Sequence, residues 1–139
     1  MYFLYGKIPF EMRQDKIPDD PFKMIMQVYF CMLLEDTYYY FSHRIFHHRL
    51  LYPSFHKLHH RYIKNVSIAG EYIHPLDFIV NNLGAISVGP VLLGNNLHFY
   101  TFIIYVLFRN GDGFSAHCGY DFPWVAYELF PLTSMIYLI

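Results

Sequence analysis

A run of 31 residues without Asp, Glu, Lys or Arg, residues 78–108, constrains the fold of this chain most strongly. As one straight helix it would measure about 46 Å, well beyond a bilayer's hydrocarbon core of about 30 Å. Turn-forming residues interrupt the run at Gly84, at Gly89 and at 94–96. The run therefore predicts a hairpin with legs 78–93 and 97–108, each shorter than the roughly 20 residues of a straight span. The legs either borrow flanking polar residues or enter the membrane without a full crossing.

Composition agrees with a membrane protein. The 139 residues are 55% hydrophobic and 21% aromatic, and only 15% are charged, against about 25% in ordinary soluble domains. This composition excludes intrinsic disorder, and a formal net charge of −1 excludes a nucleic-acid binder of the usual basic kind. We predict an all-α integral membrane protein. The alternative is a soluble all-helical domain with an unusually aromatic core.

The segment 43–70 predicts an orientation for that protein. It contains five basic residues and no acidic one. A basic segment beside apolar helices is typical of the cytoplasmic side of a membrane. Because the segment also contains most of the histidines, we expect a histidine-rich helical cap on the cytosolic side.

A first histidine pair, His43 and His47, has the spacing H-x-x-x-H. The predicted helix begins near Pro21 and runs to about Arg49, so the two imidazoles share one face. Alone, this pair is weak evidence for a metal site. Asp36 lies on the same stripe of the helix, as does Tyr40, and a carboxylate there would be able to orient an imidazole through its second nitrogen.

A second box strengthens the prediction. His56, His59 and His60 follow as H-x-x-H-H, nine residues past His47, and Pro53 suits the first turn of a new helix. Two helices joined by a short turn would present five imidazoles to one volume. Five nitrogen donors exceed what one tetrahedral zinc uses, which favours two metal ions. Imidazole suits zinc, copper, iron and nickel, so the ligand type leaves the metal open.

The remaining histidines differ in what they predict. His117 follows an expected polar turn at Gly111-Asp112-Gly113, and it is favoured as a further ligand over a hydrogen-bonded core histidine. His74 precedes a proline and is expected in extended geometry, with the ligand and core interpretations evenly matched. His48 points about 100° away from His47, toward solvent or a substrate. His98, alone in an apolar leg, is expected as a hydrogen-bonded interior histidine.

The two boxes, together with 71–77 (EYIHPLD) and 117–124 (HCGYDFPW), resemble the sterol desaturase and fatty acid hydroxylase superfamily. Within it, the C4-methyl sterol oxidase branch is the most similar. The resemblance implies an endoplasmic reticulum membrane enzyme with a non-haem centre of two iron ions. It also implies oxidation of a sterol 4-methyl group with dioxygen and electrons from NAD(P)H, delivered through cytochrome b5 or its reductase. The implied metal ligands are His43, His47, His56, His59, His60 and His117; Asp36, His74 and Asp121 are expected as outer partners or additional ligands.

The sequence also departs from that superfamily. A third H-x-x-H-H box follows the Pro-Trp segment there, whereas 132–139 contains no histidine. We therefore expect a single, incomplete domain with a linker at 1–21, histidine-box helices at 22–75, a membrane hairpin at 76–108, and a third-ligand segment with a truncated end at 109–139. The alternatives are another lipid hydroxylase or desaturase, an inactive membrane protein lacking the third box, and a metal transporter or buffer. Apart from His98, the hairpin legs contain no ionisable residue that a transport path would need, which argues against a metal transporter.

Overall fold

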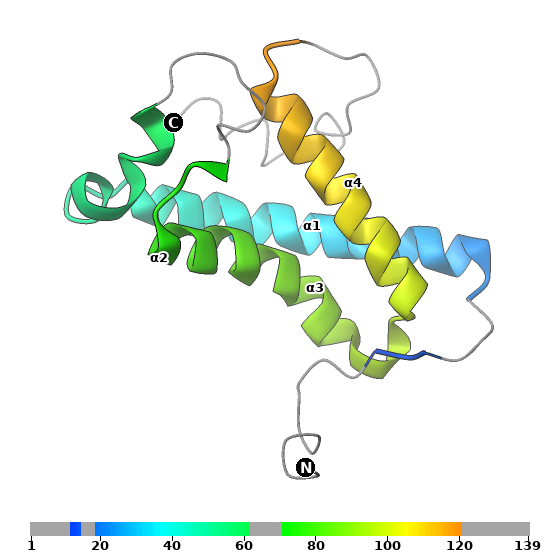
Figure 1. The fold of residues 1–139 in the computed structure, drawn as a ribbon. Coiled ribbons are helices and arrows are strands. Elements are labelled where there is room, and N and C mark those ends of the chain that lie inside the picture. The colour runs from blue at the N-terminus through cyan, green and yellow to red at the C-terminus, as the bar shows by residue number, and fades with distance from the viewer. Residues whose placement is uncertain (1–11, 15–18, 62–70, 121–139) are drawn as a thin grey trace, which may run out of the picture.

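The computed structural model describes residues 12–14, 19–61 and 71–120. Within these ranges the chain is helical and contains no β-strand, as the sequence predicts (Figure 1). The elements, in order, are α1 (Pro21–Phe46), η1 (Tyr52–His56), η2 (His59–Arg61), α2 (Pro75–Asp77), η4 (Phe78–Gly84), α3 (Ala85–Leu93), η5 (Gly94–Asn96) and α4 (Phe99–His117).

Helix α1 begins at the predicted position. Asp20 caps it, because its carboxylate accepts hydrogen bonds from the backbone N–H groups of Phe22 (3.1 Å) and Lys23 (3.4 Å). Pro21 occupies the first turn, where a missing N–H removes no hydrogen bond. The helix ends at Phe46, slightly before the predicted end at Arg49, and His47 is its C-terminal cap. The last turn of α1 therefore holds the first histidine box.

The predicted hairpin is present, but its first leg is longer than expected. The elements α2, η4, α3 and η5 follow one another as one helical rod. This rod covers the 22 residues Pro75–Asn96. The leg gains its extra length from Pro75–Asp77 at its start and from Gly94–Asn96 at its end. His74 starts the rod, since its Nδ1 accepts a hydrogen bond from the N–H of Leu76 at 3.2 Å. Gly94, with a φ of 49°, is the C-terminal cap of α3 within it.

The second leg, α4, also exceeds the prediction. It continues through Gly111, Asp112 and Gly113, where a polar turn was expected, and ends at His117. The glycines do not break the helix because α4 is held on both sides of them. Arg109 is bound to other helices just before them, and the hydroxyl of Ser115 donates to the carbonyl of Gly111 at 2.9 Å. Helix α4 thereby carries His117 back toward the histidine boxes (Figure 1).

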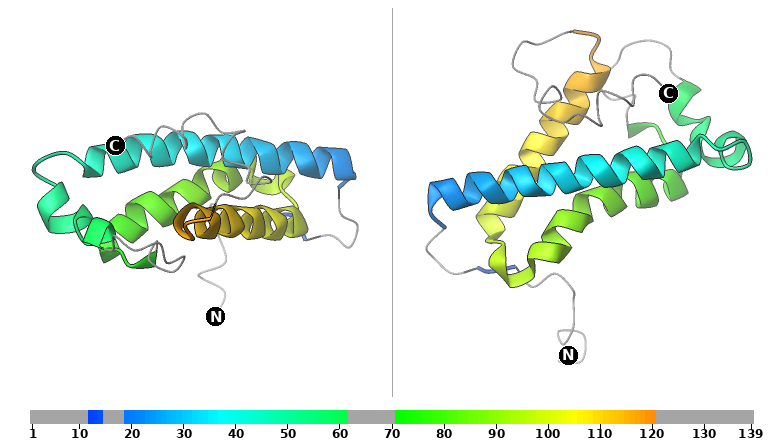
Figure 2. Two further views of the ribbon diagram at one scale, coloured as in Figure 1. Left: turned by 90° about the horizontal axis from the view of Figure 1, so that it is seen from above. Right: turned by 180° about the vertical axis from the view of Figure 1, so that it is seen from behind.

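Helix α1 lies on one side of the molecule and the two hairpin legs on the other (Figure 2). Helices α1 and α3 approach each other closely at Gly89, where an added Cβ would lie 2.7 Å from the Sγ and 2.8 Å from the Cα of Cys31. No side chain fits between the two helices at this point. The glycine thus sets the distance between α1 and the first leg.

A buried polar network fixes the second leg against α1. Arg109 Nε donates to Glu35 Oε1 at 2.8 Å, and the hydroxyl of Tyr105 donates to Glu35 Oε2 at 2.6 Å. A second guanidinium nitrogen of Arg109 donates to Asn82 of η4 at 3.1 Å. One ion pair therefore joins α1, the first leg and α4.

Much of the outer surface is apolar. Large hydrophobic side chains are exposed along α1, both legs and the loops, among them Phe22, Ile25, Ile45, Leu92, Leu107 and Phe108. The rod Pro75–Asn96 is the one helix, among the described residues, that is long and apolar enough to cross a membrane by length and composition. Only 28% of its apolar window is buried, which is less than expected for the core helix of a soluble protein.

Candidate metal centre

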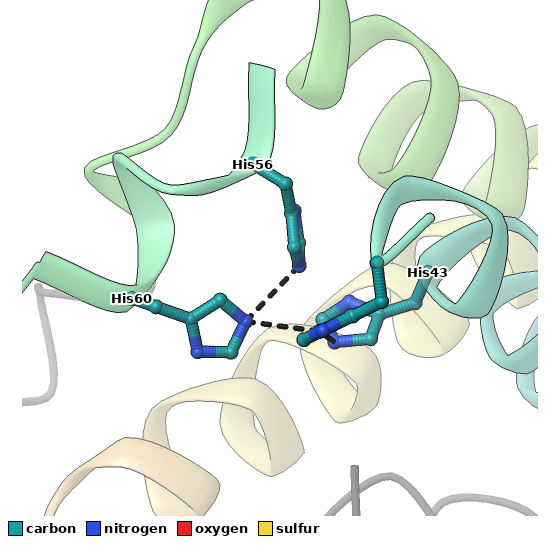
Figure 3. Close-up of side chains that lie close together, drawn as sticks. His43, His56 and His60 are labelled. Carbon is teal, nitrogen blue, oxygen red and sulfur yellow. Dashed lines mark hydrogen bonds between the residues drawn. The ribbon is translucent and has the colours of Figure 1, made fainter. Parts of the chain in front are cut away.

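The two histidine boxes converge at one end of α1. His43 lies in the last turn of α1 and His47 caps it. The chain then turns back through η1 and η2, which carry His56 and His60. The predicted α-helix after Pro53 is wrong in type, because η1 is a five-residue π-helix and η2 a 3₁₀ turn. Residues four apart nevertheless face each other there, so His56 and His60 still point into one volume (Figure 3).

Four ring nitrogens form a compact donor set. The Nε2 atom of His60 lies 3.1 Å from that of His47 and 3.1 Å from that of His56, and the Nε2 atoms of His43 and His47 are also 3.1 Å apart. All four ligand atoms lie within 4.8 Å of one another. A tetrahedral metal with N bonds of about 2.0–2.1 Å needs nitrogens about 3.3–3.4 Å apart. We call His43, His47, His56 and His60 the histidine quartet; its three 3.1 Å contacts come close to the spacing that one metal ion needs.

The electrostatics of the cluster favour metal-binding protonation states. Burial, followed by the neighbouring imidazoles, lowers the pKa of His60 and of His59 to about 4. Burial also lowers the pKa of His47. These rings are therefore neutral at pH 7, and neutral imidazole is the form that binds metals. The negative charge of Asp77 acts in the opposite direction on all three rings.

The other two predicted ligands lie beside the quartet rather than in it. The rings of His59 and His117 meet edge to face with centroids 5.6 Å apart, and His59 is 6.0 Å from His43. The Nδ1 atoms of His43 and His59 are buried without a hydrogen-bond partner. An unsatisfied buried nitrogen is costly unless something binds it, so Nδ1 of His59 also suits a site built for a ligand, whereas Nδ1 of His43 is not the nitrogen that faces the quartet. The six predicted ligands thus form a group of four and an adjacent pair.

The predicted outer partners lie elsewhere. His74 has the expected extended backbone, and it caps α2 with its Nδ1 while its ring packs on Phe55 at 5.2 Å. Asp36 is buried in the middle of α1. Asp121 lies outside the described residues. Along α1, the ring of Tyr39 is tilted against that of His43 with centroids 5.3 Å apart, and the hydroxyl of Tyr40 accepts a hydrogen bond from Arg44.

Histidines outside the boxes occupy ordinary positions. His98 is buried and its Nδ1 accepts from the N–H of Tyr100 at 3.1 Å, as an interior histidine that caps α4. His48 is exposed, and its Nδ1 accepts from the N–H of Leu50 at 3.4 Å. Both agree with the sequence interpretation.

Sequence reasoning missed the carboxylate that contacts a histidine of the quartet. Asp77 Oδ2 lies 2.6 Å from Nδ1 of His56, and Asn81 Nδ2 donates to Asp77 Oδ1 at 2.5 Å. All three side chains are buried, with 1–2% of their surface exposed. The signal was present in the sequence, because Asp77 is the last charged residue before the 31-residue run and begins a helix after His74-Pro75.

Comparison with known proteins agrees with the sequence motifs. The sequence profile described as "Fatty acid hydroxylase" matches residues 28–136. The C-4 methylsterol oxidase erg25 of Schizosaccharomyces pombe is 37% identical over 115 residues, which cover 81% of this chain and 38% of that protein. The C-4 methylsterol oxidase of Candida albicans is 35% identical (80% and 37% covered), and methylsterol monooxygenase 2-2 of Arabidopsis thaliana is 36% identical (76% and 39% covered).

The chain spans about two fifths of the length of these relatives. No solved structure matches it. The profile match covers well over half of the chain and contains both histidine boxes, His74 and His117. By this match the chain belongs to the fatty acid hydroxylase family.

Proposed function

We propose that this chain provides the metal-binding part of a membrane non-haem di-iron oxygenase that oxidises a C–H bond of a lipid, namely a sterol 4-methyl group. The observation that carries the proposal is the histidine quartet, in which two boxes bring four imidazoles together. The names of the similar proteins, C-4 methylsterol oxidase and methylsterol monooxygenase, support the reaction and the substrate class.

Iron, when bound, supplies dioxygen activation and electron transfer, which protein side chains do not provide. The quartet would hold one iron ion, and His59 with His117 would contribute to the second. Neutral nitrogen donors leave the positive charge of the metal largely uncompensated, and burial of His43 and His56 excludes water from one side of the site. In the overall reaction, one oxygen atom enters the C–H bond and the other leaves as water, with two electrons from NAD(P)H through cytochrome b5 or its reductase.

The lipid substrate enters from the membrane in this proposal. The rod Pro75–Asn96 is long and apolar enough to cross a bilayer, and its first residues lie next to the quartet through Asp77 and His56. The basic segment 43–70 would then face the cytosol, in the endoplasmic reticulum membrane. A methyl group on a sterol ring would reach the site at the membrane surface while the rest of the ring system stays in the apolar region.

The proposal is tested by expression in fission yeast depleted of its own C-4 methylsterol oxidase. Sequencing the transcript past the codon for Ile139 decides which polypeptide to express. We expect bound iron in the purified protein and conversion of 4-methyl sterols to oxidised products, both lost in His60→Ala. Oxidation of an acyl chain instead would assign another lipid hydroxylase or desaturase of the same superfamily. Normal membrane insertion without iron and without products would contradict the oxygenase proposal.

A further inference from the structure

We infer that Asp77 positions His56 for metal binding, and that Asn81 in turn positions Asp77. The inference rests on the proposed metal centre. It assigns to the first hairpin leg, which supplies no histidine to the quartet, the task of orienting one of the ligands.

The geometry of the contact determines the role. A carboxylate is a hydrogen-bond acceptor, so the 2.6 Å contact between Asp77 Oδ2 and His56 Nδ1 requires a proton on Nδ1. The lone pair of the ring then resides on Nε2, which is the atom that faces His60 at 3.1 Å. Asp77 thus selects the tautomer of His56 that can donate to a metal in the quartet. Outer carboxylate partners of this kind commonly fix metal-binding histidines.

Asp77 acts from behind the ring and not as a ligand itself. Its Oδ2 contacts the nitrogen on the far side of the imidazole from the quartet, and its Oδ1 accepts from Asn81 at 2.5 Å. Both oxygens therefore have a protein partner. The side chain of Asp77 is 3% exposed and that of His56 is 1% exposed, so water does not compete for the contact.

Asn81 follows Asp77 by four residues, and its location explains the second contact. It lies in the π-helix η4, where it contacts Asp77 while its neighbour Asn82 contacts Arg109. The carbonyl oxygen of Asn81 is buried without a hydrogen-bond partner. An unsatisfied buried carbonyl is unfavourable. The hydrogen bond that the Asn81 nitrogen donates to the Asp77 carboxylate therefore accounts for an amide at this position. Short π-helical segments frequently occur at functional sites.

The first test needs no variant. In the metal-free full chain, purified in detergent and labelled with ¹⁵N, long-range nitrogen–proton spectra report which ring nitrogen of each histidine carries the proton. We expect His56 in the Nδ1–H form. Assignment of the Nε2–H form to His56 would overturn the inference, whether or not the chain binds metal.

The second test measures cobalt(II) affinity and the visible cobalt spectrum of Asp77→Asn, Asn81→Ala and the matched control Asp19→Asn. Asp19 is a carboxylate paired with Arg13 and Lys23, in the segment before α1. We expect a loss of about 10- to 100-fold in affinity for Asp77→Asn, a smaller loss for Asn81→Ala, and no change for the control. A shifted cobalt spectrum in Asp77→Asn is expected as well, which a general loss of stability would not produce.

The outcomes separate the two proposals. Failure of the unmodified chain to bind cobalt(II) or iron(II) would contradict the metal centre, and the tautomer of His56 would still decide the role of Asp77. Normal cobalt binding in the unmodified chain with unchanged affinity and spectrum in Asp77→Asn would overturn only the positioning role. If Asp77→Asn does not fold, Asn81→Ala decides, because it keeps the carboxylate and removes one hydrogen bond; unchanged cobalt affinity there would count against the inference.

Discussion

Two polar regions lie against α1, and they differ in whether the hydrogen-bonding groups within each region satisfy one another. In the first, Glu35, Tyr105, Arg109 and Asn82 pair donors with acceptors at 2.6–3.1 Å. In the histidine quartet, ring nitrogens face each other at 3.1 Å, although a neutral imidazole has only one proton for its two nitrogens. The first region is complete by itself and stabilises the fold. The second is complete only with a cation, which is the physical difference between a structural network and a binding site.

The largest effect that this comparison predicts is on metal binding. His60 is the exposed member of the quartet, so His60→Ala removes one ligand with little effect on packing. We expect zinc(II) and iron(II) affinity to fall by about a thousandfold or more, beyond the 10- to 100-fold typical of lost outer partners. Isothermal titration measures this loss. An unchanged affinity would show that the quartet is not the site.

At the ion pair between Glu35 and Arg109, we expect a loss of stability and little change in metal affinity. Arg109→Leu leaves the partly buried carboxylate of Glu35 without its cation, and we expect a loss of stability below the about 3–5 kcal/mol typical of fully buried pairs. The double variant Glu35→Met/Arg109→Leu should recover much of that loss. Chemical unfolding in detergent measures both, and metal affinity should stay within about twofold of the unmodified chain. Equal losses in the single and double variants would contradict a pairing role, and a large loss of metal affinity would erase the distinction between the two regions.

A smaller effect is expected where α1 meets α3. Gly89→Ala would place a methyl group against the backbone of Cys31, and overpacking of this kind typically costs about 1–3 kcal/mol. Gly111→Ala is the matched control, since nothing lies within 4 Å of its added Cβ. In a helix interior that control should gain about 0.5–1 kcal/mol. Thermal unfolding compares the two, and equal stability changes would contradict the close helix contact.

The last expected effect is a change of stability with pH, which comes from protonation of His60 in the quartet and of its neighbour His59. In the metal-free chain the pKa of His59 and of His60 is about 4, below the ordinary value of 6.5. Between these values the unfolded chain binds more protons than the folded chain, so stability falls as pH drops from about 7 toward 4. Above pH 7 these histidines contribute no slope. Melting temperatures in the presence of a chelator should decrease on acidification, less steeply in His60→Ala; a rise would contradict the assignment.

The sequence was most informative where the signal is local. The uncharged run and its glycines predicted a hairpin, and Asp20-Pro21 predicted the start of α1, because helix capping depends on neighbouring residues. Box spacing likewise predicted that His43, His47, His56 and His60 would meet. The prediction of a turn at 111–113 was wrong because glycine only weakens a helix, and contacts of Arg109 with other helices hold α4 through it.

The partners that depend on tertiary packing were not predictable in the same way. Asp36 shares a stripe with His43 on α1, and this made it the expected orienting carboxylate. The contact to His56 comes instead from Asp77, which is 21 residues away and reaches the site only because the first leg packs beside η1. Helical periodicity carries no information about such a pair. The division of six ligands into a quartet and the pair His59–His117 also depends on how the loops and α4 are placed.

The central claim is that two histidine boxes form one nitrogen-only metal site, and X-ray absorption spectroscopy of the zinc(II)-loaded chain tests it most directly. We predict about four nitrogen neighbours at about 2.0–2.1 Å, with the multiple scattering that imidazole rings produce. His60→Ala should remove one of them. A spectrum dominated by water oxygens, without imidazole scattering, would contradict the site.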